Sequence, residues 1–243
     1  MPSSLPPANA FDAVEGLQAV LWDMDGTLVD TEPYWIAAEQ ALVEEHGGRW
    51  TEEDGLRLVG QALPTSARML QDAGVRLGVR EIIDALIAEV LRGVEREVPW
   101  RPGARELLAD LDRHGVPCAM VTMSEGPLAG LVAAGLPSGT FRFLVTGDMV
   151  SVGKPDPEPY LMALSTLQES IESLAPHRVV ALEDSLPGAT SAAASGAATI
   201  AVPHRGHVPP AAGWELWDTL AGVGAPHLDA FVRHRSPVAG AKP

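Results

Sequence analysis

The sequence predicts an α/β protein, with a parallel β-sheet core and an all-helical segment inserted after the first strand. A short apolar run at residues 17–22 is typical of a buried strand. Residues 32–99 carry helical periodicity and no convincing strand. From residue 116 onward, short apolar runs alternate with helical segments, which is the pattern of a parallel sheet covered by helices on both faces.

The first strand and the helical insert follow from local signals. The run at residues 17–22 ends at Asp23, where Asp-Gly-Thr marks a turn. Residues 51–54 (Thr-Glu-Glu-Asp) resemble a capping box and predict the start of a helix. Apolar residues at helical spacing predict the other helices of the insert, over 33–48, 64–73 and 80–98.

The second half of the chain repeats a strand-then-helix unit. Pro102 fits the first turn of a helix that Gly115 ends. Strands are expected after it at 116–121, 142–146, 178–182 and 198–202, with helices at 125–134, 156–168 and 186–195. Residues 211–231, which include Trp214 and Trp217, are expected to pack as a final irregular or helical piece.

These elements predict one core domain with an inserted domain. The α/β core would comprise residues 17–31 and 100–231, and the helical cap residues 32–99. Residues 1–16 and 232–243 are expected to be flexible tails.

The charge of the chain excludes several classes of partner. A formal net charge of −15 repels phosphate backbones and anionic lipids, so neither nucleic-acid nor membrane binding is expected. A small phosphorylated substrate stays compatible, because a bound cation can reverse the local field. Cys118 is the single cysteine, and the N-terminal segment has no signal-peptide pattern, so we expect a cytoplasmic protein.

The first motif, DMDGT, places two carboxylates at the carboxyl end of the first strand. Open α/β sheets bind ligands at that end, and strand alternation points Asp23 and Asp25 the same way. One carboxylate can attack phosphorus and bind a cation, while the other protonates the leaving oxygen. The alternative is a polar turn with two solvated aspartates.

Hydroxyl and amino groups follow later elements. Thr122 ends the second core strand, and with Ser124 it can hold phosphate oxygens, although such residues usually cap helices. Lys154 is one of only two lysines, against 15 arginines, which suggests that an ammonium group is needed there. A surface lysine at a turn is the alternative.

A second acidic pair follows the strand at 178–182. Carboxylates at Glu183 and Asp184 make an oxygen-rich site of the kind that Mg²⁺ prefers. The alternative is that Asp184 caps the next helix and Glu183 is solvated.

Taken together, the stretches LWDMDGTLVDTEP, VTMS, GKPDPEPY and LEDSLPGATSAAASG resemble the haloacid dehalogenase-like phosphatases, in the branch with a helical cap after the first strand. The resemblance covers residues 17–203 and implies a Rossmann-like core. It implies that Asp23 is the nucleophile, Asp25 the acid and base, and that Thr122 and Lys154 bind the phosphoryl group. It also implies a Mg²⁺ cofactor held by Asp23, the Asp25 carbonyl and Asp184, with Glu183 helping.

These roles predict a phosphatase of a small phosphorylated metabolite, acting as a monomer or weak homodimer. The same branch contains β-phosphoglucomutases, which hold a distal phosphate with a cap arginine. Leu63 stands at that position here and Glu125 stands where a base is expected, although Arg57 or Arg68 could substitute. A catalytically silent binding protein would normally lack one of the motif acids, and this chain has them all.

Overall fold

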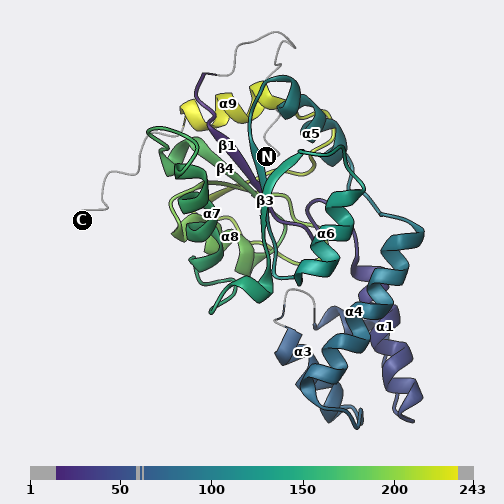
Figure 1. The fold of residues 1–243 in the computed structure, drawn as a ribbon. Coiled ribbons are helices and arrows are strands. Elements are labelled where there is room, and N and C mark those ends of the chain that lie inside the picture. Colours follow the sequence, from purple (N-terminus) through teal and green to yellow (C-terminus); the bar gives the residue numbers. More distant parts are fainter. Residues whose placement is uncertain (1–14, 59–60, 62, 235–243) are drawn as a thin grey trace.

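The computed structural model describes residues 15–58, 61 and 63–234. Its core is a six-stranded, fully parallel sheet in the order β3-β2-β1-β4-β5-β6 (Figure 1). The strands are β1 (Ala19–Trp22), β2 (Cys118–Val121), β3 (Phe141–Val145), β4 (Val179–Glu183), β5 (Ala198–Ala201) and β6 (Trp214–Leu216). The predicted α/β fold class is therefore confirmed.

Alternation along the strands divides the core between the two faces of the sheet. In β1, Val20 and Trp22 join a cluster with the helices on one face, namely α5 (Ala104–Arg113), α6 (Gly126–Ala134) and α9 (Ala225–His234). Ala19 and Leu21 join a cluster with α7 (Glu158–Gln168) on the other face. The central strands are buried on both faces, which explains why they are apolar up to Glu183 at the end of β4. The core also contains α8 (Leu186–Ala194).

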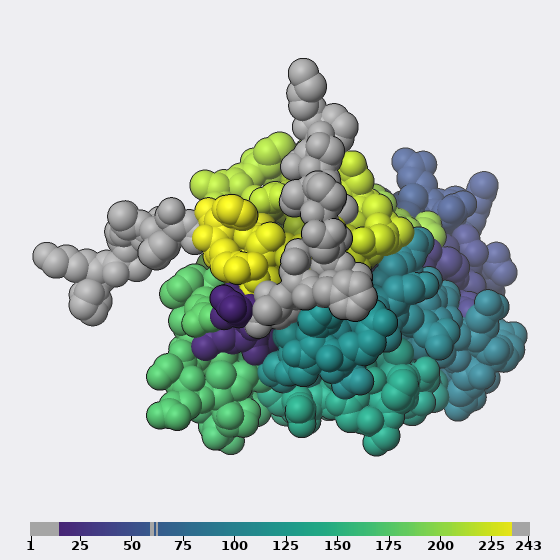
Figure 2. Space-filling view, turned by 90° about the horizontal axis from the view of Figure 1, so that it is seen from above, coloured from purple at the N-terminus to yellow at the C-terminus, as the bar shows by residue number. Residues whose placement is uncertain are grey.

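Short 3₁₀ helices at Gly147–Met149 and Pro176–Arg178 complete the core. α9 lies beside α5, and Figure 2 shows this yellow helix against the teal residues of the chain. Asp229 of α9 accepts hydrogen bonds from the backbone N–H groups of Gly16 and Leu17, so the end of the expected N-terminal tail is attached to the core.

In the described part of residues 32–96, all regular secondary structure is helical. They are α1 (Glu32–Glu45), α2 (Glu52–Leu56), α3 (Leu63–Asp72) and α4 (Val79–Arg96). α4 packs against α1 and α3, and the group projects from one end of the sheet (Figure 1). The capping box is present, because Thr51 and Asp54 each accept a hydrogen bond from the backbone of the other.

Two elements differ from the sequence prediction. Residues 214–216, expected in an irregular or helical piece, form the edge strand β6, whose neighbour in the sheet is β5. A three-residue strand is too short to show its period in the sequence. α9 continues to His234, so residues 232–234, expected in a tail, are helical. The other residues of the two expected tails, 1–14 and 235–243, lie outside the described residues.

No helix among the described residues is both long and apolar enough to cross a bilayer.

We expect Leu107→Ala in α5 to destabilise the protein by about 2–5 kcal/mol, because it opens a cavity in the main core. Leu107 is fully buried, whereas Leu161, which is 48% exposed, offers a matched control. Urea unfolding followed by circular dichroism measures both variants. A loss for Leu107→Ala no larger than that for Leu161→Ala would contradict the packing described here.

Candidate functional site

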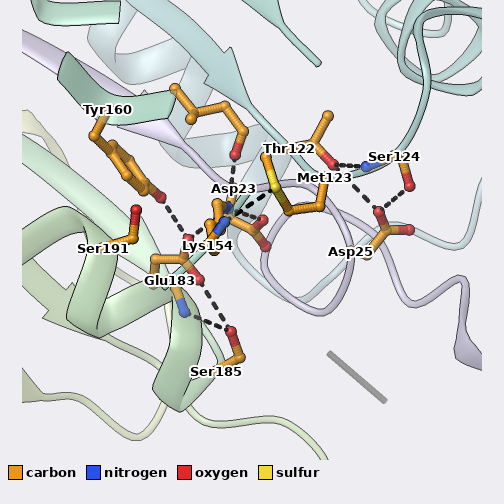
Figure 3. A network of polar contacts seen from close by, with 12 residues as sticks. Asp23, Asp25, Thr122, Met123, Ser124, Lys154, Tyr160, Glu183, Ser185 and Ser191 are labelled. Atoms are coloured by element: carbon orange, nitrogen blue, oxygen red, sulfur yellow. Dashed lines mark hydrogen bonds and ion pairs between the residues drawn. The ribbon is translucent and has the colours of Figure 1, made fainter. Parts of the chain in front are cut away.

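The polar residues singled out in the sequence meet at the carboxyl edge of the sheet (Figure 3). Asp23 follows β1, Thr122 follows β2 and Glu183 ends β4. Because β1, β2 and β4 are parallel neighbours, their carboxyl ends lie side by side. The chain also reverses its direction of travel across the sheet between β1 and β4, which is where open α/β sheets form ligand crevices.

Lys154 joins the two acidic motifs. Its Nζ lies 2.7 Å from Asp23 Oδ1 and 2.6 Å from Glu183 Oε1, and it donates to the carbonyl oxygen of Val121 at 2.9 Å. The side chain is only 6% exposed. Burial would lower the pKa of Lys154, but the carboxylates of Asp23 and Glu183 outweigh it and raise that pKa, so the ammonium stays charged.

Glu183 is held in place by a residue that the sequence analysis did not single out. The hydroxyl of Tyr160, on α7, donates to Glu183 Oε1, and its ring faces Lys154 Nζ at 5.2 Å from the centroid. A Cβ on Gly188 would lie 1.8 Å from Glu183 Oε2, so only glycine fits beside this carboxylate. Burial and the charge of Asp23 raise the pKa of Glu183.

Asp25 is surrounded by hydroxyl groups. Its carboxylate accepts hydrogen bonds from Thr31, from Ser124 Oγ at 2.7 Å and from Thr122 Oγ1 at 3.4 Å. Thr31 was not anticipated from the sequence, where it stands as an ordinary helix cap, yet it makes no capping bond to α1. Burial raises the pKa of Asp25 against the opposing effect of these hydrogen bonds.

Asp23, Glu183 and Asp184 offer carboxylate oxygens that lie within 4.8 Å of one another. Asp23 Oδ2 is buried and has no hydrogen-bond partner among the described residues. A Cβ on Gly26 would lie 2.1 Å from Asp184 Oδ2, so this glycine, with φ +90°, leaves the carboxylate its place. Burial and the charges of Asp23 and Glu183 raise the pKa of Asp184 well above its usual value.

These residues fit a Mg²⁺ ion, because all donors are oxygens, one is unpartnered and the negative charge is in excess. The side chain of Asp25 does not belong to the cluster. Its predicted contribution to the metal site was its backbone carbonyl, which stays a prediction.

A cavity of about 130 Å³ opens over these groups. Asp23, Asp25, Lys154 and Asp184 line its floor, and the helical segment supplies its roof. The roof includes Glu32, Trp35, Ile36, Glu39, Leu58 and Leu63. The cavity therefore lies between the core and the helical segment, which are joined in the chain by the β1–α1 connection.

Two acidic residues in the roof were missed by the sequence analysis. Burial and the nearby Asp25 raise the pKa of Glu32 to about 7. Burial raises the pKa of Glu39 to about 8, although Trp50 Nε1 donates to its Oε2 at 3.2 Å. The signal was their spacing, since Glu32, Ile36 and Glu39 recur on one face of α1. An acidic pair on a face that also buries apolar residues is unusual.

Comparison with known proteins assigns the chain to one family. Residues 17–196 match the haloacid dehalogenase-like hydrolase family. The phosphorylated carbohydrates phosphatase of Thermotoga maritima is 31% identical over 74% of this chain and 82% of its own. The N-acetylmuramic acid 6-phosphate phosphatase of Pseudomonas aeruginosa is 36% identical over 76% of this chain and 81% of its own.

Among solved structures, CbbY from Rhodobacter sphaeroides in complex with phosphate has a TM-score of 0.77 and 29% identity, covering 88% of this chain and 99% of that chain. A variant of CbbY, solved in complex with xylulose-1,5-bisphosphate, gives the same values.

We expect Glu39→Gln to stabilise the protein increasingly as the pH rises. The pKa of Glu39 is raised from 4.5 to about 8, so the wild type loses stability as the pH rises through that window, while the amide does not titrate. The difference should approach on the order of 5 kcal/mol above about pH 8. Unfolding measured across pH tests this, with the exposed Glu45→Gln on the same helix as control. A pH-independent difference would contradict a buried Glu39.

Proposed function

The chain belongs to the haloacid dehalogenase-like hydrolases, and on that premise we propose that it is a Mg²⁺-dependent phosphatase of a small phosphorylated carbohydrate. The observation that carries the proposal is the setting of Asp23. One oxygen is bound to Lys154, and the other is buried beside Asp184 with no partner in the described part of the chain, at the floor of a cavity. Relatives named as phosphatases of phosphorylated carbohydrates and of an amino-sugar phosphate support this substrate class.

In this proposal Asp23 is the nucleophile. A carboxylate oxygen of Asp23 attacks phosphorus as the bond to the leaving oxygen breaks, which forms an aspartyl-phosphate. Lys154 and Thr122 hold the transferring phosphoryl group, with Ser124 at the edge of the same pocket. A bound Mg²⁺, held by Asp23, Asp184 and the Asp25 carbonyl, would neutralise charge on the phosphoryl oxygens.

Asp25 is proposed as the acid and base. Its raised pKa favours the protonated form that the leaving oxygen needs. After the leaving group departs, the carboxylate of Asp25 takes a proton from the water that attacks the aspartyl-phosphate, which releases inorganic phosphate. The hydroxyls of Thr31 and Ser124 orient the carboxylate for both steps.

Glu183 is proposed as a positioning residue more than as a metal ligand. One of its oxygens accepts from both Lys154 and Tyr160, so its main effect is to place the ammonium against Asp23. A supporting contribution to the metal site, through the other oxygen, remains part of the prediction.

We propose that residues 32–99 act as a cap over this site, joined to a core of residues 17–31 and 100–231. The two crossings are bonded to each other, because Asp30 N–H donates to the Pro99 carbonyl at 2.8 Å and Arg101 N–H to the Leu28 carbonyl at 2.9 Å. Such a cap can exclude water while Asp23 attacks.

A mutase is the weaker alternative. Leu63 lines the cavity, whereas Arg57 and Arg68, which could have replaced the cap arginine, are exposed and do not line it. Glu125, which stands where a base is expected in the mutases, is instead paired with Arg80 of α4 through contacts of 2.6 and 2.9 Å. A silent binding protein is disfavoured, since every motif acid lines the cavity or the metal cluster. Cytoplasmic location and a monomeric or weakly dimeric state stay predictions.

The proposed function predicts Mg²⁺-dependent release of inorganic phosphate from sugar phosphates, and its loss in Asp23→Asn. The amide keeps the size of the side chain but is neither a nucleophile nor an anionic ligand. Activity should fall below about 1% of wild type. Asp112→Asn, at an exposed position of α5, is the matched control. Substantial turnover by folded, metal-loaded Asp23→Asn would remove Asp23 from this role, and an isomerised sugar phosphate as product would favour the mutase.

For Asp25→Asn we expect a loss of about 10²–10⁴-fold on alkyl phosphates, the usual range for a positioned acid and base. The loss should be smaller on nitrophenyl phosphate, whose leaving group departs without a proton. Steady-state kinetics on both esters measures the difference. Equal losses would mean that Asp25 only maintains the structure of the site.

A further inference from the structure

Met123 connects the two loops that form the proposed phosphoryl site. It stands between Thr122 and Ser124, and its side chain lines the cavity. Its Sδ accepts a hydrogen bond from the backbone N–H of Lys154, with 3.3 Å between the sulfur and the nitrogen (Figure 3). The position of Lys154 therefore depends on the thioether of Met123 as well as on the carboxylates that hold its ammonium group.

Both loops pack closely on Met123. A Cβ on Gly153 would lie 2.8 Å from Met123 Sδ, and a Cβ on Gly147 would lie 2.2 Å from the Met123 carbonyl oxygen. Heavy atoms approach so closely only if the backbone or a side chain shifts. Because the side chain lies between the loop and the cavity, an oxygen atom added to this sulfur would either displace the backbone at Gly153 and Lys154 or point into the cavity.

Met123 differs from the other sulfur-containing residues in its access to solvent. It is half-buried and, among the described methionines, it is the one that lines the cavity, so a molecule the size of hydrogen peroxide can contact it. Cys118 is buried, and burial raises the pKa of its thiol to about 12, so this thiol is unreactive. The other described methionines are fully buried, packed against the apolar clusters or exposed outside the cavity; they are Met24, Met69, Met120, Met149 and Met162.

We propose that Met123 is an oxidation site at which hydrogen peroxide switches off the phosphoryl site. The sulfur attacks one peroxide oxygen, and the S–O bond forms as the O–O bond breaks. The sulfur is oxidised by two electrons, and the departing hydroxide takes the proton of the transferred oxygen and leaves as water. The product is methionine sulfoxide, a polar group that methionine sulfoxide reductases convert back to methionine. This role rests on the proposed function, because the activity that is lost is that of the phosphatase.

The test follows inactivation of the full chain by hydrogen peroxide, assayed with Mg²⁺ and nitrophenyl phosphate, while peptide mass mapping measures oxidation at each methionine. We expect activity to fall in step with sulfoxide at Met123, by about tenfold or more at full oxidation, because a misplacement of about 1 Å can cost that much. Inorganic phosphate should slow oxidation of Met123, since it would occupy the same cavity, and leave oxidation of Met149 unchanged.

Two variants distinguish the cavity methionine from an exposed one. Met123→Leu keeps a similar volume without the sulfur, and it should retain most of its own initial activity under a treatment that inactivates the wild type. Met149→Leu, at a position that is 53% exposed, should be inactivated like the wild type. Inactivation of Met123→Leu at the wild-type rate overturns the role of Met123, as does loss of wild-type activity before Met123 is oxidised. If Met123→Leu is inactive before treatment, this second comparison decides.

A measurement without turnover separates this role from the proposed function. Calorimetry gives the affinity of the wild type for inorganic phosphate with Mg²⁺, before and after oxidation. We expect the affinity to fall by about tenfold, because Lys154 is displaced or the cavity is blocked. An unchanged affinity overturns the role of Met123. Absence of phosphate release from any ester by the untreated protein would instead overturn the proposed function, while the binding comparison still applies.

Discussion

The site depends on one buried ammonium group. Lys154 Nζ lies between Asp23 and Glu183 and is almost without contact with solvent. Without this ammonium group, the carboxylates of Asp23 and Glu183 would face one another in the protein interior, where charges are screened poorly. Its position depends in turn on α7, because Tyr160 of that helix fixes Glu183 and packs in the core on one face of the sheet. The packing of α7 against the sheet therefore also determines the geometry of the site.

One ammonium group does not balance the charge. Three carboxylates converge at this point, those of Asp23, Glu183 and Asp184. They fit because Gly26 and Gly188 beside them have no side chain. The raised pKa values of Glu183 and Asp184 express the same imbalance, since burial and mutual repulsion oppose ionisation. A divalent cation would remove this repulsion, so the feature that is unfavourable in the apoprotein would favour the Mg²⁺ ion of the proposed function.

The roof of the cavity also contains acidic residues that are unfavourable to ionise. Glu39 is unfavourable to bury, yet it is placed where a ligand would meet it. The connection between roof and floor is itself held by charge, because Asp30, at the first crossing, pairs with His204 and Arg205 from the segment after β5. Burial would raise the pKa of Asp30, but these two partners lower it. The relative placement of the two halves of the cavity is thus tied to the segment that follows β5 at the same edge of the sheet.

Much of this was predictable from local signals. Short apolar runs followed by Asp23, Thr122 and Glu183 predicted a parallel sheet with polar groups at one edge, because the carboxyl ends of parallel strands lie at the same edge. Lys154 was identified by its rarity and by the Pro-rich helix start that follows it.

Only the tertiary structure decided the roles of Thr31, Tyr160 and Glu39. In the sequence they are indistinguishable from a helix cap, a core aromatic and a surface acid, because local periodicity says which residues share a face but not what that face meets. The edge strand β6 escaped prediction for a related reason, since its pairing with β5 and not its own short pattern makes it a strand. Packing between segments distant in the chain assigned each of these residues its partner.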